Sequence, residues 1–503
     1  MSEGTTAETP AHRPGGAGSE TPSHRSNVPL ASAGLVLGML LSVLDQTVVA
    51  IALPDIASDI GGASSSGWVV TAYVLASTAT GTLYGRLSDR YGRRGVFVVA
   101  VVLFVVASLL CGMAQSMPQL IAARVLQGIG AGALFVIPTV TLSELYPTHL
   151  RGRVQGLTGG VFALASLGGP LVGGAITDGF GWRWIFYINV PLGILSILLC
   201  MFALRVPKPV AGGKVDLAGS ALLIGGVVSL LLITQWGGRD HAWASGTILG
   251  LIAACLALFA LFVWWEGRAE NPLLPMRLFT NPSLRLVLPA TLILGMLLYG
   301  SVVYMPTFLQ AAYGMSATEA GLALNPYFIP FLVVSAVTGG KAGASGRFKP
   351  YLLTGAVVLG IAFLGLGLLD IDSPYLLVAV AMAVLGIGFG LLMQNLVVVS
   401  QNAAAPPDLA ATTAANLSIR GLGMAIGVAL FGSLLSREIG AGPVTPEATA
   451  AAIPDVFVWG APLALVLALL IGLLPRQQAP QPSTDGGTED HDPAGTATRP
   501  GAA

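Results

Sequence analysis

Two opposite charges lie within long apolar stretches of this 503-residue sequence. Asp45 falls in the first such stretch, at residues 30–53, and Arg124 falls in another, at residues 118–142. An ionised carboxylate inside hydrocarbon is costly, so we expect Asp45 to face a water-filled cavity, pair with a cation or hold a proton. Two interpretations stay open: Asp45 couples to protons or substrate, or it is a structural acid that a neighbour neutralises.

Arg124 is a candidate partner for Asp45 because the two residues lie at similar depth. Asp45 precedes Leu53, at the end of its stretch, by eight residues, or about 12 Å of helix at 1.5 Å per residue. Arg124 follows Pro118, at the start of its stretch, by six residues, or about 9 Å. If these two ends share one side of a membrane, the opposite charges can pair across a cavity.

Other polar residues within apolar stretches are candidates for a cavity lining. Tyr73 and Ser77 lie four residues apart and share one face of a predicted helix, where hydrogen bonding between helices is the alternative role. Arg420 is a second buried cation, so with Arg124 and Asp45 the interior has two positive charges and one negative. This balance argues against a site for multivalent cations and leaves anionic, zwitterionic and neutral ligands open. The candidate cavity residues are Tyr73, Ser77, Asn325, Tyr327, Asn416 and Arg420.

These side chains must be held by helices that cross a membrane. Hydrophobic residues make up 54% of the chain and charged residues 10%, whereas a soluble protein carries roughly 25% charged residues. A helix of about 20 apolar residues crosses the hydrocarbon of a bilayer. The sequence therefore predicts an all-α integral membrane protein with fourteen spans. We place them at residues 30–53, 66–84, 95–115, 118–142, 154–176, 184–204, 216–236, 246–265, 285–311, 320–339, 350–369, 374–399, 411–434 and 456–475.

Basic residues indicate the orientation, because cytoplasmic loops carry an excess of Lys and Arg. With the N-terminus in the cytoplasm, nineteen basic residues fall in inner segments, three in outer segments and two within spans, which accounts for all 24. We therefore expect both termini in the cytoplasm. Only four basic residues are lysines, and this skew, together with abundant Ala and Gly, indicates a bacterial protein of the inner (plasma) membrane.

Two loops of similar composition indicate an internal repeat. A Gly- and Arg-rich loop at residues 85–94 has a weaker counterpart at residues 339–349, as expected for a pair of six-helix halves. The predicted organisation has five parts: a disordered cytoplasmic tail at 1–29, an N-terminal six-helix half at 30–204, a linker with two extra transmembrane helices at 205–284, a C-terminal six-helix half at 285–475 and a second disordered cytoplasmic tail at 476–503.

Several kinds of functional site are absent from the sequence. The cysteines Cys111, Cys200 and Cys255 lie in apolar runs, where a thiol is usually inert. All five histidines lie outside the predicted spans, which excludes an intramembrane metal cluster bound through imidazole, and no phosphate-binding GxxxxGK[ST] loop occurs. We therefore expect no cofactor, no metal and no nucleic-acid partner. A membrane-embedded enzyme or receptor is a disfavoured alternative.

Glycines mark two places where helices should pack closely. Two pairs have the GxxxG spacing of close helix contacts in membranes. A proline beside the second pair removes a backbone hydrogen bond and predicts a kink, which indicates a bending or tightly sealed helix. The residues are Gly128 and Gly132 in the first pair, and Gly168, Gly169, Gly173 and Gly174 around Pro170 in the second.

Together these features resemble the major facilitator superfamily, and within it the fourteen-span drug:proton antiporters, over residues 30–475. The resemblance implies a fold of two six-helix halves, here with two extra central helices, and a proton-driven transporter without a cofactor. It rests on five motifs: Leu44-Asp45-Gln46-Thr47 with Ala52-Leu53-Pro54, the loop GRLSDRYGRR from Gly85 to Arg94, Arg124-Val125-Leu126-Gln127-Gly128, Gly169-Pro170 with Gly173-Gly174, and Trp182-Arg183-Trp184-Ile185-Phe186 with Asn189-Val190-Pro191.

The resemblance implies roles for particular residues. Asp45 would couple transport to protons, Arg124 would take part in proton transfer, and the motif at residues 169–174 is associated with exporters. The loop at residues 85–94 would act as a gate, because its aspartate and arginines can form charge-assisted bonds with the opposite half and hold the inner side closed. The alternative is that its arginines only orient the chain, and the counterpart loop has no aspartate. The gate residues are Gly85, Asp89, Arg90, Gly92 and Arg93.

We therefore expect a proton-coupled efflux transporter for lipophilic small molecules, antibiotics among them, that works by alternating access. The two halves would rock about a site near the midplane, with protons moving in and substrate moving out. The alternative is a dedicated exporter of one metabolite with the same fold. We expect a monomer, because the spans carry no signal for self-association beyond their internal packing motifs.

Overall fold

The structure is a computed structural model that describes residues 27–62, 65–204, 216–238, 241–270, 272–274, 276–405, 408–439 and 445–475. The predicted tails before residue 27 and after residue 475 lie outside the described residues. The described part is helical, with a single bridge between Gly237 and His241, which confirms the all-α prediction for that part. The elements are α1 Val28–Ile60, α2 Gly67–Tyr91, α3 Arg93–Gly112, α4 Met117–Leu145, α5 Thr148–Phe180, α6 Trp184–Tyr187, α7 Asn189–Ala203, α8 Leu217–Trp236, α9 Gly246–Glu266, the 3₁₀ helix η2 Met276–Thr280, α10 Leu284–Tyr313, α11 Ala317–Leu322, α12 Asn325–Ser345, α13 Lys349–Gly367, α14 Tyr375–Ala403, α15 Leu409–Ile439, α16 Pro446–Val458 and α17 Gly460–Gly472.

Within the described residues, 13 helical segments are long and apolar enough to cross a membrane. Three of them combine a short helix with the next one: α6 with α7, α11 with α12, and α16 with α17. The remaining predicted span, 66–84, corresponds to α2, which has 25 residues and a polar face with several Ser, Thr and Tyr residues, and which is not among these 13 segments. The chain is therefore a multi-pass membrane protein, and the count of fourteen spans stays a prediction.

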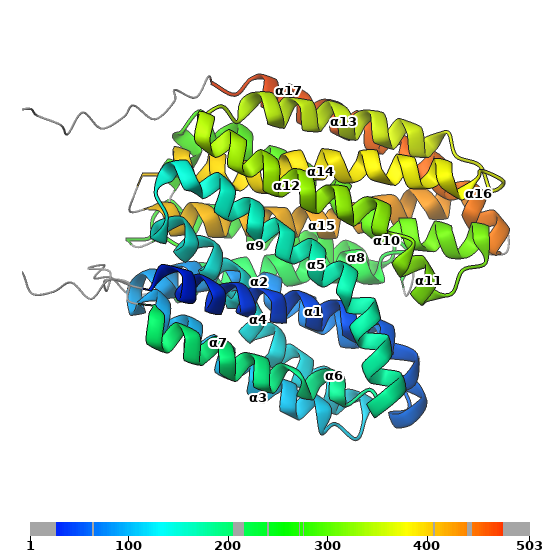
Figure 1. Cartoon of the computed structure of the whole chain (residues 1–503), viewed down its shortest axis with the longest axis horizontal. Coiled ribbons are helices and arrows are strands. Elements are labelled where there is room, and N and C mark those ends of the chain that lie inside the picture. The colour runs from blue at the N-terminus through cyan, green and yellow to red at the C-terminus, as the bar shows by residue number, and fades with distance from the viewer. Residues whose placement is uncertain are drawn as a thin grey trace, which may run out of the picture.

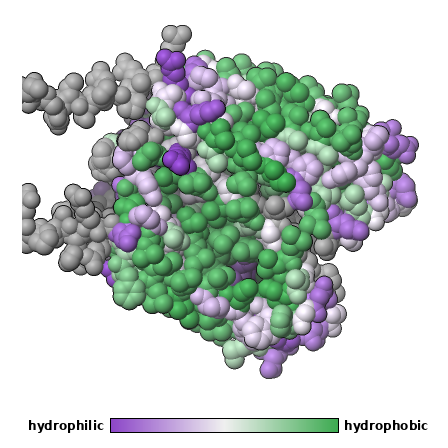
Figure 2. All heavy atoms as spheres, viewed as in Figure 1, coloured by the Kyte–Doolittle hydropathy of each residue, from purple (hydrophilic) through white to green (hydrophobic). Residues whose placement is uncertain are grey.

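The helical bundle has two ends and an apolar middle. The chain enters α1 and leaves α17 at the same end, on the left in Figure 1, which we call the terminus end; the other is the distal end. Figure 2 shows hydrophobic residues over the middle of one face and hydrophilic residues towards its two ends. Large apolar side chains such as Leu195, Leu256 and Leu376 are exposed. This surface suits contact with lipid, because hydrocarbon imposes no cost on exposed apolar atoms.

The parts of the chain before α8 and after α9 each bury a core of their own. A buried cluster in α1–α7 includes Phe97 and Phe104, and a larger one in α10–α17 includes Phe331, Phe363 and Phe431. We call α1–α7 the N-terminal bundle and α10–α17 the C-terminal bundle. They occupy nearly the same residues as the two predicted six-helix halves, and their independence as domains stays a prediction.

Helix α8 lies across the seam between the two bundles. Its residues Val227 and Leu231 share a buried cluster with Ala79 of α2 and Ala425 of α15. Helix α9 packs on α8, with Phe259 against this cluster, and exposes much of its remaining surface. The extra pair of helices therefore covers one side of the interface between the bundles.

The segment between α9 and α10 is bonded to both bundles at the terminus end. We call residues 272–274 and 276–281 the strap. Arg86 of α2 donates from Nε to the carbonyl oxygen of Leu273 at 3.0 Å. Arg277 forms a bidentate ion pair with Asp408, which lies just before α15. Its Nη2 donates to Oδ1 at 2.7 Å and its Nε donates to Oδ2 at 3.1 Å. The strap therefore connects the extra helices to the ends of α2 and α15.

Candidate functional site

Asp45 of α1 and Arg124 of α4 form an ion pair inside the N-terminal bundle. Arg124 Nη1 lies 2.5 Å from Asp45 Oδ2, and both side chains are fully buried. The helical rise brings the two residues to the same depth, so the pairing predicted from the sequence is confirmed. Because a buried carboxylate next to a guanidinium is a place where one proton can change the charge balance, this pair is the centre of the candidate site.

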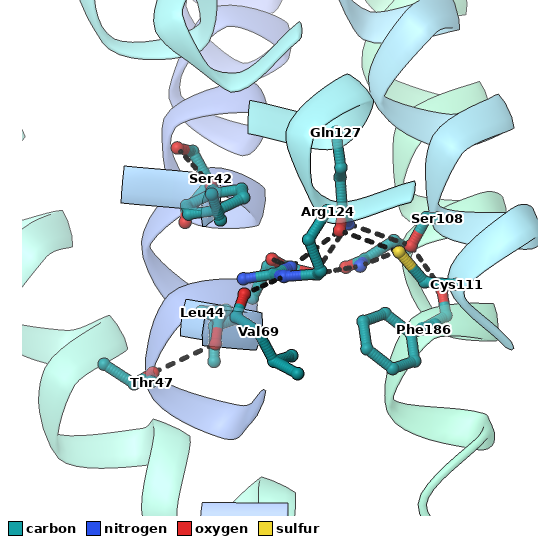
Figure 3. A network of polar contacts seen from close by, with 12 residues as sticks. Ser42, Leu44, Thr47, Val69, Ser108, Cys111, Arg124, Gln127 and Phe186 are labelled. Carbon is teal, nitrogen blue, oxygen red and sulfur yellow. Dashed lines mark hydrogen bonds and ion pairs between the residues drawn. The ribbon is translucent and has the colours of Figure 1, made fainter. Parts of the chain in front are cut away.

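Two amides complete the surroundings of the Asp45 carboxylate. Gln127 Nε2 and Asn189 Nδ2 each donate to Asp45 Oδ1 at 2.8 Å. Both amides also donate to Ser108 Oγ, at 3.1 and 2.9 Å, and Ser108 donates to the carbonyl of Phe186 at 2.9 Å. Figure 3 shows this network converging from several helices. The carboxylate therefore accepts three hydrogen bonds, all from side chains of the N-terminal bundle.

Arg124 has further partners that hold its guanidinium in place. Its Nε donates to the Val69 carbonyl at 3.0 Å, and its Nη1 donates to Gln127 Oε1 at 2.6 Å. Its Cζ lies 4.1 Å from the centre of the Tyr73 ring, a cation–π contact. Nη2 is buried without a hydrogen-bond partner. The arginine is thus tied to both α2 and α4 besides Asp45.

A central cavity lies between the two bundles, next to this network. It has a volume of about 390 Å³, within the range of sites for small molecules. Its wall comes from α1, α2, α4, α5, α8, α10, α14 and α15. Gln46 Nε2 of α1 donates to the Tyr299 hydroxyl of α10 at 3.3 Å, so both bundles meet at its wall. Its polar lining residues are Ser42, Gln46, Thr71, Ser77, Thr78, Thr234, Tyr299, Ser418 and Arg420.

Asp45 is not on the cavity wall, but it is connected to it. Its neighbours Ser42, Val43 and Gln46 line the cavity, whereas Asp45 points into the N-terminal bundle. The Tyr73 hydroxyl, beside Arg124, donates to the Ser42 carbonyl at 2.9 Å. The acid and the cavity are therefore separate sites, joined through Arg124, Tyr73 and Ser42.

Of the six predicted cavity residues, Ser77 and Arg420 lie on the wall and four do not. Tyr73 packs on Arg124 instead. Tyr327 is buried in the aromatic core of the C-terminal bundle, with its ring stacked on Phe331 at 6.3 Å between centroids. Asn416 donates to Thr291 Oγ1 at 3.1 Å.

Asn325 is the fourth of these residues, and it begins α12. Its Oδ1 is buried without a hydrogen-bond partner. These four residues do not line the central cavity of this structure, because sharing a helix face does not determine which neighbour that face meets. Their role in substrate binding stays a prediction.

The predicted gate bonds differently from expectation. Arg93 pairs with Asp89 at 3.2 Å and with Glu144, where Nε lies 2.5 Å from Oε2. It also donates to Ser88 Oγ at 3.1 Å. These bonds connect α2, α3 and α4 of the N-terminal bundle. Arg93 is the first residue of α3, which begins directly after α2, so its side chain lies beside the end of α2. Among the described contacts, Asp89 makes no bond to the opposite bundle, which corrects that prediction.

Glycines of the gate have separate roles. A Cβ at Gly85 would lie 2.8 Å from Ala414 Cβ of α15, so Gly85 allows α2 to approach the opposite bundle. Gly92 has φ +89°, a conformation that favours glycine, and it reverses the chain between α2 and α3. Arg90 lies over the ring of Tyr91 at 5.3 Å. At Gly85, the contact between α2 and α15 is therefore made by a glycine and a small side chain.

Helices α5 and α12 close the terminus end through glycines. A Cβ at Gly156 would lie 2.6 Å from the carbonyl oxygen of Ser335, and one at Gly339 would lie 3.2 Å from Gly156 Cα. Gly152 and Gly339 approach each other more closely still. Such distances leave no room for a side chain, so the two bundles are in backbone contact there. This contact joins the N-terminal and C-terminal bundles at the terminus end.

The predicted antiporter motif packs α5 against α1. A Cβ at Gly173 would lie 3.0 Å from Val48 Cγ1, and one at Gly169 would meet the side chain of Thr47. Gly174 has open space at the same position. Pro170 lies in the same helix, and its side chain is not among the described ones. The close helix contact predicted from the glycine spacing is confirmed for Gly169 and Gly173.

Gly173→Leu is expected to impair transport and to lower the free energy of unfolding. Overpacking a close contact costs about 1–3 kcal/mol, and here the new side chain would meet Val48, 3.0 Å from the added Cβ. Gly174→Leu is the matched control, because its Cβ meets nothing within 4 Å. Thermal unfolding in detergent and transport in vesicles measure both variants. Equal behaviour of the two would contradict a tight α1–α5 contact.

The tryptophan-rich motif at the start of α6 holds the distal end. Arg183 Nη1 lies 2.6 Å from Asp59 Oδ2 of α1, and Trp182 Nε1 donates to the same oxygen at 3.1 Å. These two donors hold the pKa of Asp59 below its usual value. The motif therefore connects the distal end of α1 to α6, directly before Asn189 enters the Asp45 network.

Several network residues were not identified as site residues from the sequence. Gln127 and Asn189 both stand in motifs that the sequence analysis quoted, three residues after Arg124 and five after Trp184. Their convergence on one carboxylate oxygen requires the packing of α1, α4 and α7. Ser108 stands in an apolar run without a signal of its own. It was therefore detectable only in three dimensions.

Comparison with known proteins agrees with a membrane-transport fold. The chain matches the Major Facilitator Superfamily over residues 35–428 and 287–500. It is 36% identical over 411 residues to the multidrug transporter protein MdtP of Bacillus subtilis, which covers 82% of this chain and 76% of that protein. It is 35% identical over 419 residues to multidrug resistance protein 3 of Bacillus subtilis, covering 82% of this chain and 81% of that protein.

A solved structure shows the same fold at low sequence identity. A double-tryptophan mutant of XylE superimposes with a TM-score of 0.64 and 15% identity, over 90% of this chain and 96% of that one. The sequence match spans most of the described helices and includes Asp45, Arg124 and the gate loop. The chain therefore belongs to the major facilitator superfamily, whose members are membrane transporters rather than enzymes.

Proposed function

We propose that this protein is a proton-coupled efflux transporter for lipophilic small molecules that works by alternating access. The observation that carries the proposal is the buried pair of Asp45 and Arg124, held beside a cavity that both bundles line. Relatives named as multidrug transporters support the direction and the class of substrate. Within the superfamily, the proposal assigns the chain to the fourteen-span drug:proton antiporters.

The geometry suggests how a proton would act on the cavity. A proton on Asp45 removes the charge that holds Arg124, so the guanidinium is free to shift against Tyr73, 4.1 Å from its Cζ. Tyr73 is bonded to Ser42 on the cavity wall. Protonation would therefore change the packing of α1 against α2 where they line the cavity. This route couples the two sites without requiring the substrate to touch Asp45.

Features of the terminus end support alternating access, in which that end opens and closes during transport. Glycine contacts close it here, yet buried polar atoms without partners gather on the C-terminal bundle near the same end, including Gln394 Nε2, Gln401 Oε1 and Thr412 Oγ1. Buried polar groups without hydrogen bonds are costly. Opening of the terminus end in the alternate state would give these groups water.

The remaining parts of the proposal concern the cell. Following the distribution of basic residues, the terminus end faces the cytoplasm of a bacterium and the transporter lies in its inner (plasma) membrane. The proton gradient drives transport without a cofactor, and the monomer is the working unit. The partners are protons, lipid and small-molecule substrates, including antibiotics.

Export from proteoliposomes under an imposed pH gradient tests the proposed function. Purified protein is reconstituted, and a panel of lipophilic compounds of different charge is followed with and without the gradient. Export of several compounds that collapses with the gradient supports a multidrug antiporter. Gradient-driven export of one compound alone supports the second candidate, a dedicated metabolite exporter. Export that is unaffected by the gradient contradicts proton coupling.

Leu231→Trp is expected to reduce transport of bulky compounds more than transport of small ones. Leu231 of the extra helix α8 lines the cavity, so a larger side chain there takes volume from the substrate. We expect a selectivity change of at least about fivefold, the size that small differences in pocket volume usually produce. Leu256→Trp on α9 is the control, because Leu256 is 66% exposed. An unchanged size preference would exclude α8 from the substrate site.

A further inference from the structure

Arg420 is a buried cation on the cavity wall that faces no carboxylate. It lies on α15, is 7% exposed and lines the central cavity. None of the ion pairs among the described residues includes it, and its Nη1 is buried without a hydrogen-bond partner. Its Cζ lies 5.7 Å from the centre of the Phe135 ring, a cation–π contact. Within the described part of the chain, this positive charge at the cavity therefore has no counter-charge.

The contrast with Arg124 shows what is missing. Arg124, which is fully buried, has Asp45 at 2.5 Å. Asp45 does not line the cavity, so it is not available to Arg420. Leaving a buried charge without its partner is costly. No acid among the described residues supplies that partner to Arg420, which leaves a ligand in the cavity as a source of the negative charge.

The rest of the wall defines the body of the ligand. Among the described lining residues Arg420 is the one charged side chain, and the others are apolar, aromatic, hydroxyl or amide groups. Phe135, Phe162 and Tyr299 offer aromatic surface, which suits flat apolar molecules. A cavity of about 390 Å³ falls within the size range of small-molecule sites.

We infer that the central cavity binds amphipathic monoanions, with the carboxylate or other acidic group on the Arg420 guanidinium and the apolar body against the aromatic wall. This inference rests on the proposed transport function and specifies its substrate class. A carboxylate suits the site, because the planar fork of arginine binds its two oxygens together. A cationic compound would meet the uncompensated charge of Arg420 and bind more weakly.

Equilibrium binding of three matched probes tests the inference. Pyrenebutyrate, pyrenebutanol and pyrenebutylamine share one apolar body and differ in charge, and fluorescence anisotropy follows each with purified protein in detergent. We expect wild-type protein to bind the anion at least tenfold more tightly than the alcohol or the amine. Arg420→Gln should lower anion affinity at least tenfold and leave the alcohol within threefold, and Arg420→Lys should retain part of the preference.

Controls separate this inference from the proposed function. Arg437→Gln removes an exposed arginine from the same helix and should leave all three affinities unchanged. If the probes bind without preference for the anion, or if Arg420→Gln leaves that preference intact, the inference is overturned while transport stands. If the wild type binds no probe, the cavity is not a binding site for lipophilic molecules, and the proposed function loses its site as well.

An anionic lipid headgroup carries the same kind of acidic group as a free anion. A separate competition experiment therefore distinguishes the two ligands. Phosphatidylglycerol or phosphatidylcholine is added in micelles to the wild type with pyrenebutyrate bound. Displacement by phosphatidylglycerol alone identifies a lipid as a competing occupant of the same anion site. The absence of displacement assigns the site to free anions. Equal displacement by both lipids shows that charge does not matter, which contradicts the inference.

Discussion

Asp45→Asn is expected to abolish export driven by a pH gradient while the protein remains folded in the membrane. The amide can neither take up nor release a proton, and loss of a proton-transfer group usually lowers a rate by about 100-fold or more. The geometry adds a second reason. The carboxylate accepts bonds from Arg124, Gln127 and Asn189, so an amide nitrogen in either orientation would face a donor. Arg124 would also lose its counter-charge.

The measurement compares gradient-driven export with exchange of labelled for unlabelled substrate across the same vesicles. Exchange needs both bundles to rock but needs no net proton movement, so it should persist in Asp45→Asn and report a folded carrier. Asp55→Asn is the control, since Asp55 is an exposed acid on the same helix. Gradient-driven export at the wild-type rate in Asp45→Asn would remove Asp45 from proton coupling. Loss of export in Asp55→Asn as well would show a general effect of charge on α1.

Gly339→Ala is expected to shift the protein towards a state that is open at the terminus end. The added Cβ would lie 3.1 Å from the carbonyl carbon of Gly152 and 3.2 Å from Gly156 Cα. Neither backbone atom can rotate away, so α5 and α12 must separate. A strain of about 1–3 kcal/mol confined to the closed state would change the ratio of closed to open by roughly five- to 150-fold.

Labelling of Thr412→Cys by a maleimide reports this shift. Thr412 lies on α15 near the terminus end and is 1% exposed, so the introduced thiol is protected while that end is closed. The three native cysteines are buried, which keeps the background low. We expect Gly339→Ala to raise the labelling rate at least about fivefold. Gly340→Ala is the matched control, because a Cβ there meets nothing within 4 Å.

Equal labelling of the two glycine variants would contradict the seal. In that case the α5–α12 contact would not limit opening, and the contact of Gly85 with Ala414 would be the next candidate. A rise in labelling for both variants would indicate a general loosening of α12. Substrate transport should fall in Gly339→Ala, because a carrier that rests open at one end completes fewer cycles.

Quantities that depend on position along one helix were accessible from the sequence. The depths of Asp45 and Arg124 follow from a constant rise per residue, so their pairing could be predicted and is observed. Close helix packing at Gly169 and Gly173 follows from the absence of side chains on one helix face, whereas its partner, α1, comes from the structure. Membrane character follows from composition alone.

Direction around each helix was not accessible in the same way. Tyr73 and Ser77 share a face of α2, yet Tyr73 packs on Arg124 and Ser77 lines the cavity. Asp89 was expected to reach the opposite bundle, but the immediate start of α3 after Gly92 places Arg93 beside it. In both cases the neighbouring helix determines the partner, and a single sequence carries no record of which helix that is.

The sequence by itself determined that this chain crosses a membrane many times and that an acid and an arginine lie deep in its N-terminal part. It also determined which helix faces carry glycines that permit close contact. The tertiary structure decided that Asp45 points away from the cavity, that α8 forms part of the cavity wall, and that Arg420 makes no ion pair with any described acid. The reason is physical. Hydrophobicity, charge and helical rise are properties of the chain read in one dimension, whereas the rotation of each helix is set by its packing against helices distant in sequence.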